Sequence, residues 1–369
     1  MHELTPELTE LLERFRARRR VALGRAISLV ENERPGFQAF LHHALSEAGL
    51  RSARVGLTGP PGAGKSSLGA ALATAWRAAE AEVGIVAVDP TSPFSGGALL
   101  GDRIRMNDLA TDPGIFIRSM ATRGSLGGLA ATTREVLDLM DAYGFERLLV
   151  ETVGVGQTEL EITGATDTVV VVLVPESGDA IQAMKAGLME IADIFVVNKA
   201  DRPGADRLVK EVRMALHLRM GEGPTDAGTG PSDAGAGHHG VDLSRMTRRD
   251  EEAAPDKQPR RWEQPAGWQV PVLKTVAHAG EGIDELMQAI DAHRTHLIES
   301  GELETRRRAR AETRTRDVVE RELRRRVWMS ESRLKHLEQS LERVAQGVAT
   351  PYSVAGEIVE LFLSEGTGA

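Results

Sequence analysis

The sequence contains no cysteine and little lysine, and both shortages narrow the chemistry that it can perform. Without cysteine, the chain can form no disulfide, use no thiol nucleophile and bind no metal through thiolates. Only seven of its 45 basic residues are lysine, so lysines that fall within motifs are candidates for function. Three of them do so: Lys65, Lys185 and Lys199. A chain of 369 residues can bury a sizeable core without covalent staples.

The chain also lacks an excess of basic residues and a long apolar run. Its 54 acidic residues outnumber the 45 basic ones, giving a formal net charge of −9. This balance argues against general nucleic-acid binding, which requires a broad basic face. The longest uninterrupted apolar run, residues 169–174, is far shorter than the roughly 20 residues of a membrane span. The N-terminus is acidic and amphipathic, unlike a secretion signal. We expect a cytoplasmic protein that binds neither nucleic acid nor membranes.

Three regions of different character follow one another along the chain. Residues 1–50 have helical patterns, with Thr5 as a predicted N-cap followed by proline. In residues 51–299, short apolar runs alternate with helical stretches, which is typical of a parallel sheet buried on both faces. Residues 300–369 are helical and highly charged. The predicted fold class is α/β, a doubly wound, mostly parallel sheet with helical N-terminal and C-terminal extensions. Its predicted strands are 54–58, 83–88, 148–150, 168–174, 194–197 and 270–273.

A stretch within the central region departs from this pattern. Residues 221–240 contain nine glycines or prolines and no leucine, isoleucine, valine, phenylalanine or methionine. Such a composition cannot bury enough apolar surface to offset the entropy cost of ordering the chain. We therefore predict that residues 221–262 are a disordered insertion.

A glycine-rich motif follows the first predicted strand of the central region. Residues 59–66, GPPGAGKS, match the phosphate-binding pattern G-x-x-x-x-G-K-[ST] between a strand and a helix. Its backbone N–H groups and the helix N-terminus favour a bound phosphate. Lys65 is expected to reach the β- and γ-phosphates, and Ser66 to bind Mg²⁺. The predicted phosphate contacts are Gly59, Pro60, Pro61, Gly62, Ala63, Gly64, Lys65, Ser66 and Ser67.

A second motif predicts which base is bound. Asn198, Lys199 and Asp201 form an N-K-x-D pattern directly after the strand 194–197. A carboxylate there can accept hydrogen bonds from guanine N1–H and N2–H₂, whereas adenine would leave it unpaired. The predicted ligands are therefore GTP and GDP. Residues after the last strand are expected to contact the base through backbone N–H groups: Thr275, Val276, Ala277 and His278.

Acidic residues at the ends of other strands complete the predicted site. Glu151 ends the strand 148–150 and can hold Mg²⁺ through water, while the Gly154 N–H can meet the γ-phosphate. Asp89, which closes the strand 83–88, and Asp102 are further acids expected near the phosphates. Mg²⁺ favours oxygen ligands, water and few carboxylates, so all three acids need not touch it.

One absence concerns the rate of hydrolysis. Small signalling GTPases place a water-orienting glutamine directly after the glycine that corresponds to Gly154. Here Val155 stands at that position, and the nearest glutamine is Gln157. We therefore expect slow intrinsic hydrolysis that a partner accelerates.

Several longer segments carry a family resemblance. The segments GPPGAGKSSL, VDPTSPFSGGALLGDRIRM, ETVGVGQTE, GDAIQAMKAGLMEIADIFVVNKAD and GEGIDEL together resemble the methylmalonyl-CoA mutase-associated GTPases of the MeaB/ArgK type. The resemblance implies a homodimer, joined through its C-terminal helices, that binds an adenosylcobalamin-dependent acyl-CoA mutase, gates cofactor loading and protects the mutase from inactivation. It also assigns Lys65, Asp89, Asp102 and Glu151 to the metal and hydrolysis network, and 182–188 with Lys185 to a partner-responsive switch.

Two departures and two alternatives accompany the resemblance. Val276 stands where the family usually has serine, and the 221–262 insertion has no counterpart in the family pattern. One alternative is a metal-delivery GTPase, against which the absence of cysteine counts because such proteins usually carry Cys-x-x-Cys or a histidine-rich tract. The other is a transport-coupled ATPase or kinase, against which Asp201 argues because it favours guanine.

Overall fold

The structure, a computed structural model, divides into two compact units. It describes residues 3–46, 49, 51–89, 109–121, 132–152, 161–175, 187–219 and 267–366. The units are residues 1–300 and 301–369. The first contains the predicted parallel sheet together with the N-terminal helices. The insertion predicted for residues 221–262 lies outside the described residues.

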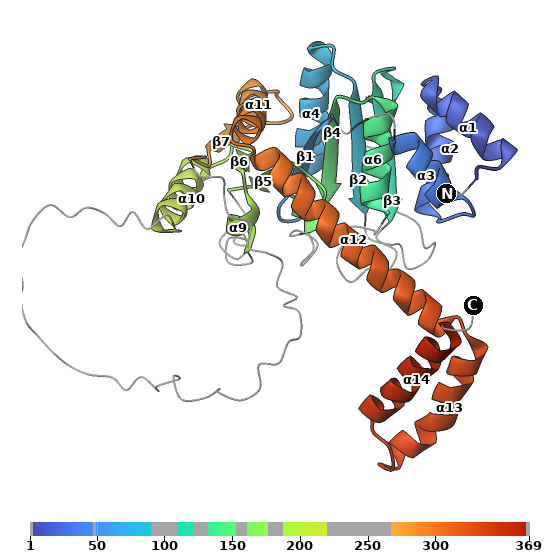
Figure 1. Ribbon diagram of the computed structural model, residues 1–369. Coiled ribbons are helices and arrows are strands. Elements are labelled where there is room, and N and C mark those ends of the chain that lie inside the picture. The colour runs from blue at the N-terminus through green and yellow to red at the C-terminus, as the bar shows by residue number, and fades with distance from the viewer. Residues whose placement is uncertain are drawn as a thin grey trace, which may run out of the picture. The chain divides into compact units, whose positions relative to one another are not determined.

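The sheet of the first unit has seven strands, all paired in parallel, in the order β3-β2-β4-β1-β5-β6-β7 (Figure 1). The strands are β1 (Ala53–Thr58), β2 (Val83–Asp89), β3 (Ile115–Ala121), β4 (Arg147–Thr152), β5 (Thr168–Leu173), β6 (Ile194–Asn198) and β7 (Val272–Thr275). The carboxyl ends of all seven strands share one edge because the pairing is parallel. The strand order runs in opposite directions on the two sides of β1, and ligands of such sheets bind at this switch point.

Helices cover both faces of the sheet and bury three apolar clusters. The longer ones are α4 (Lys65–Ala78), α6 (Thr133–Tyr143), α10 (Ala205–Arg219) and α11 (Ile283–Glu299); η1 (Leu109–Thr111), η2 (Ile162–Gly164) and α9 (Met189–Ile191) are short. Side chains of α4 and α11 pack on one face, and α6 packs on the other together with the N-terminal helices. Residues of α10 form a third cluster with β5 and β6. The sheet is therefore buried on both faces, as its continuous apolar strands predicted.

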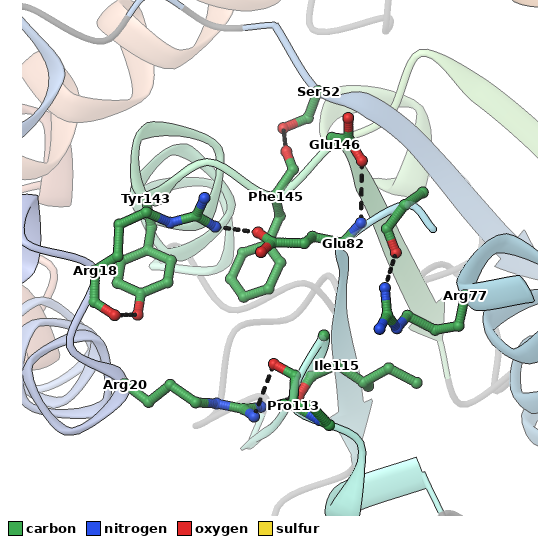
Figure 2. A network of polar contacts seen from close by, with 12 residues as sticks. Arg18, Arg20, Ser52, Arg77, Glu82, Pro113, Ile115, Tyr143, Phe145 and Glu146 are labelled. Atoms are coloured by element: carbon green, nitrogen blue, oxygen red, sulfur yellow. Dashed lines mark hydrogen bonds and ion pairs between the residues drawn. The ribbon is translucent and has the colours of Figure 1, made fainter. Parts of the chain in front are cut away.

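The N-terminal helices are α1 (Pro6–Arg16), α2 (Arg20–Glu31) and α3 (Phe37–Leu45). Thr5 caps α1 as predicted, because its side chain accepts a hydrogen bond from Leu8 N. The helices pack on α6 and share its apolar cluster. Two arginines at the junction of α1 and α2 reach the amino ends of the neighbouring strands (Figure 2): Arg18 forms an ion pair with Glu82, and Arg20 donates to the Pro113 carbonyl at 3.1 Å. These helices are therefore an integral layer of the first unit.

The strand β3 is absent from the sequence prediction. Its residues, IFIRSMA, include Arg118 and Ser119, which interrupt the apolar run expected of a strand buried on both faces. The structure places β3 at the edge of the sheet, where it pairs with β2 alone and where polar side chains can reach solvent or a neighbouring helix. Arg118 forms an ion pair with Glu31 of α2. A pattern that requires continuous burial misses such an edge strand.

The second unit consists of α12 (Glu302–Trp328), α13 (Glu331–Ala345) and α14 (Pro351–Gly366). Its buried apolar side chains, within the described part of the chain, are Val354 and Ile358. Glu357 joins α13 to α14 by accepting a hydrogen bond from His336 at 2.7 Å. No described helix in either unit is long and apolar enough to span a membrane.

Candidate nucleotide-binding site

The glycine-rich loop connects β1 to α4 at the carboxyl edge of the sheet, as the motif predicted. Gly59 has φ +134°, and a Cβ there would lie 2.1 Å from the Val172 carbonyl oxygen of β5. Gly64 has φ +84°, and its Cβ would lie 2.5 Å from Asn198 Nδ2. Only glycine allows the loop to pass this close to its neighbours. The narrow path leaves the backbone N–H groups free of side-chain bulk, as phosphate binding requires.

Lys65 and Ser66 begin α4 and are both buried. The Lys65 ammonium donates to the Gly59 carbonyl at 2.8 Å and to the Pro60 carbonyl at 3.1 Å, so its charge lies inside the curve of the loop. The Ser66 hydroxyl donates to Glu151 Oε1 at 2.6 Å. A cation, a hydroxyl and a carboxylate thus meet at the start of one helix.

The donor set fits Mg²⁺. The Ser66 hydroxyl and the Glu151 carboxylate are hard oxygen ligands, and both residues are at least 93% buried. Among the described residues no cluster of three or more histidine, aspartate or glutamate side chains forms a site for a metal ion. A site with few protein carboxylates suits Mg²⁺, which usually keeps several waters and takes further oxygens from a bound phosphate.

Asn198 connects the predicted guanine motif to the phosphate loop. Its Nδ2 donates to the Ala63 carbonyl at 2.9 Å, across 135 residues of sequence. Its Oδ1 accepts from Thr275 Oγ1 at 3.1 Å and from Ala277 N at 3.3 Å. One buried amide therefore ties together the phosphate loop, the end of β6 and the segment after β7.

The remaining residues of the guanine motif lie in the turn that follows Asn198. Lys199 adopts φ +55°, and its ammonium donates to the Gly62 carbonyl at 2.9 Å. The Ala200 N–H donates to the Thr275 carbonyl at 3.0 Å, which fixes the turn against β7. Asp201 follows in the turn and is exposed. The structure thus brings Asn198 and Lys199 onto the loop and leaves the Asp201 carboxylate accessible to a base.

Several other predicted residues are exposed, lie at a strand end or fall outside the described residues. Ser67 is exposed on the first turn of α4, and His278 is exposed just after Val276 and Ala277. Asp89 is the last residue of β2 and pairs with Ala121 of β3. Asp102, Gly154, Lys185 and Gln157 lie outside the described residues.

The structure also shows two side-chain contacts that the sequence patterns did not predict. The Thr275 hydroxyl orients Asn198, although the sequence suggested only backbone contacts for this segment. Thr58 and Thr152, which end β1 and β4, place their hydroxyl oxygens 3.3 Å apart beneath the site. Threonine is common in strands, so neither position carried a signal of its own.

Comparison with known proteins agrees with this geometry. A family model described as "Methylmalonyl Co-A mutase-associated GTPase MeaB" matches residues 23–332. The chain belongs to this family. Relatives match along nearly the whole MeaB-type chain. PH0274 of Pyrococcus horikoshii, named as a GTPase, is 41% identical over 353 residues, covering 96% of this chain and 98% of its own. GTPase ArgK of Escherichia coli (strain K12) is 32% identical over 364 residues and 97% of each chain.

A solved structure shows the same fold in a relative. It is a crystal structure described as an LAO/AO transport system kinase, 27% identical, with a TM-score of 0.61, covering 98% of this chain and 100% of that one. The predicted fold class, a doubly wound GTPase-type sheet with helical extensions, is thereby confirmed.

Proposed function

We propose that this MeaB-family protein binds GTP with Mg²⁺ and hydrolyses it to GDP and phosphate. The arrangement of Asn198 supports the proposal most strongly, because it joins a base-binding motif to a phosphate loop through hydrogen bonds of 2.9–3.3 Å. In this proposal the backbone of the loop and Lys65 hold the phosphates, and Asp201 accepts guanine N1–H and N2–H₂.

In the proposed reaction, different residues of the chain bind Mg²⁺, stabilise the transferred phosphoryl group and orient the attacking water. Ser66 and Glu151 would hold Mg²⁺, which when bound neutralises charge on the β- and γ-phosphates. Lys65, already inside the loop, stabilises the charge that spreads over the transferred phosphoryl oxygens. Asp89, Asp102 and Gly154 are proposed to complete the network that orients the attacking water.

The test of base specificity compares GTP and ATP. We expect the wild-type protein to bind GTP at least 100-fold more tightly than ATP. Adenine offers the Asp201 carboxylate no pair of N–H donors, so a bound adenine would cover this carboxylate and leave it unpaired, at a cost of roughly 3 kcal/mol. Asp201→Ala should remove most of this preference. Asp206→Ala, which removes a nearby exposed acid paired with Lys274, is the matched control and should retain it. Equal binding of ATP and GTP by the wild-type protein would contradict the proposal.

We further propose that the partner is an adenosylcobalamin-dependent acyl-CoA mutase of the methylmalonyl-CoA mutase type, for which this GTPase gates cofactor loading and acts as a protective chaperone. The support is the family's description and the extent of the match, residues 23–332. A pull-down from the source cell with GDP and with a non-hydrolysable GTP analogue should recover a mutase in at least one state. Lys65→Ala, with weakened phosphate binding, should abolish any difference between the two states. Recovery of no mutase in either state would argue against a chaperone.

Slow intrinsic hydrolysis belongs to the same proposal. Because Val155 replaces the water-orienting glutamine, the protein alone should turn over slowly, and the mutase should accelerate it. Single-turnover hydrolysis with and without purified mutase measures both rates. Fast hydrolysis that the mutase does not change would contradict the expectation.

We also propose that two copies associate through the second unit. Its α13 exposes Leu334 at 47% and Leu341 at 56%, two helical turns apart on one face. Val359 and Leu363 form a similar exposed pair on α14, at 49% and 60%. A helical hairpin that exposes these apolar side chains, and that buries only two apolar side chains among its described residues, gains most by packing against a second copy.

A further inference from the structure

Two buried threonines tie the ends of β1 and β4 together directly beneath the proposed Mg²⁺ site. The backbone register of the two strands runs from Ala53 opposite Arg147 to Leu57 opposite Glu151. Beyond that point β1 continues into the phosphate loop, and the chain after β4 continues towards Gly154. Thr58 and Thr152 each come one residue after this last pair, and their side chains connect β1 to β4.

The contact is made by the Thr152 hydroxyl. It lies 3.3 Å from Thr58 Oγ1 and 3.4 Å from the Leu57 carbonyl oxygen, so its single proton is shared between two acceptors on β1. Thr58 is 0% exposed and Thr152 is 1% exposed. Buried hydroxyls are costly unless they are hydrogen-bonded, and valine, which has nearly the same shape, would need no partner. The hydroxyls therefore contribute something other than packing.

Successive residues of a strand point to opposite faces of the sheet. The Thr58–Thr152 contact therefore lies on one face, and the Glu151 carboxylate lies on the other. Glu151 shares its face with Leu149, in the cluster under α4, where its carboxylate meets Ser66 at 2.6 Å. Thr152 shares its face with Val150, in the cluster under α6. The neighbouring strand β2 places Val88 opposite Thr152, one residue before Asp89. The threonine pair thus links β4 to β1 on the face covered by α6, while Glu151 contacts Ser66 on the face covered by α4.

We propose that Thr152 is a positioning residue for the Mg²⁺-dependent reaction: its hydroxyl bond to β1 sets where the end of β4 presents Glu151 to Ser66. The proposal rests on the proposed function, because it assumes that Ser66 and Glu151 serve Mg²⁺ and GTP. Thr152 does not touch the substrate. Its loss moves the Glu151 carboxylate, and small displacements in phosphoryl-transfer sites reduce rates strongly.

The experiment compares hydroxyl removal with hydroxyl retention in the full-length protein. Thr152→Val should lower the single-turnover rate of GTP hydrolysis about three- to tenfold and raise the Mg²⁺ concentration needed to retain fluorescent GDP by a similar factor. Thr152→Ser keeps the hydroxyl and should restore both values close to wild type, even if it lowers the melting temperature. Thr58→Val should act in the same direction. The double variant should be little worse than Thr152→Val, because both changes remove one interaction.

A matched control separates positioning from stability. Thr168→Val removes another buried threonine hydroxyl, bonded to His293 at 2.9 Å at the amino end of β5, and should lower stability without changing either readout. The proposal is overturned if Thr152→Val keeps wild-type values, if Thr152→Ser loses as much as Thr152→Val, or if Thr168→Val gives the same loss. A wild-type protein that binds GDP with Mg²⁺ yet hydrolyses no GTP would refute hydrolysis, and the Mg²⁺ requirement would still decide the role of Thr152.

Discussion

The two units of this protein use similar helices in opposite ways. In the first, α4 buries Leu68, Leu72 and Trp76 completely against the sheet, in one of three apolar clusters. In the second, the apolar side chains that the described part of the chain buries are Val354 and Ile358, while other apolar side chains of α13 and α14 are about half exposed. The first unit thus has a core sufficient for independent stability, and it carries the candidate site. The second unit has a small apolar core and exposes apolar side chains, as interaction surfaces do.

The largest expected effect comes from comparing a buried tryptophan of the first unit with an exposed tryptophan of the second. Trp76 of α4 is 1% exposed, and Trp328 at the end of α12 is 41% exposed. Trp76→Ala should lower the free energy of unfolding of the first unit by about 3–5 kcal/mol, because it leaves a cavity in a packed core. Trp328→Ala should change stability by no more than about 0.5 kcal/mol. Chemical denaturation of both variants measures the difference. Comparable losses would show that the second unit has a core of its own.

A charge placed on the outer face of α13 should separate two copies. Leu341→Glu is expected to weaken self-association at least tenfold, because it would bury an unpaired carboxylate in an apolar contact. Sedimentation or mass photometry over a range of concentrations reports this change. Val21→Glu, at a residue of α2 that is 72% exposed, is the matched control in the first unit and should leave the mass unchanged. A wild-type protein that remains monomeric at high concentration would refute the role of the second unit in assembly.

The smallest expected effect concerns the polar link between α13 and α14. Hydrogen bonds from His336, followed by those from Arg343, hold the pKa of Glu357 below its usual value. A carboxyl group whose pKa is lower in the folded state stabilises that state above the unfolded pKa, near 4.5, and loses the contribution as pH falls through the folded value. Hydrogen-exchange protection of α14, corrected for intrinsic rates, should therefore fall slightly between about pH 5 and pH 3. Glu357→Gln should remove this pH dependence.

Short local patterns were sufficient to predict much of the fold and the position of the glycine-rich loop between β1 and α4. Six strands appeared as continuous apolar runs because a parallel sheet covered on both faces excludes water from both sides of each strand. The loop at residues 59–66 was recognisable because its tight backbone path requires glycine at fixed positions within a short stretch of sequence. Thr5 correctly predicted the start of α1, because an N-cap side chain accepts a hydrogen bond from the first turn of the helix that follows it in sequence.

The predictions that failed or stayed incomplete involved contacts between distant segments. The edge strand β3 was missed because Arg118 makes an ion pair with Glu31, 87 residues away, which no local pattern reveals. The contacts of the Thr152 and Thr275 hydroxyls were not predicted, because their partners, Thr58 and Asn198, lie 94 and 77 residues away along the chain.

The order of residues along the chain was enough to predict a glycine-rich loop between a strand and a helix, an N-K-x-D motif after a later strand and a helical C-terminal region, since each depends on residues that are close in sequence. Only the folded sheet decided how the glycine-rich loop and the N-K-x-D motif meet. Ser66 and Glu151 are 85 residues apart, and Asn198 and Ala63 are 135 apart, yet parallel pairing brings the carboxyl ends of β1, β4 and β6 to one edge. The chemistry of the site depends on distances of about 3 Å between atoms, and such distances are set by strand register and side-chain packing.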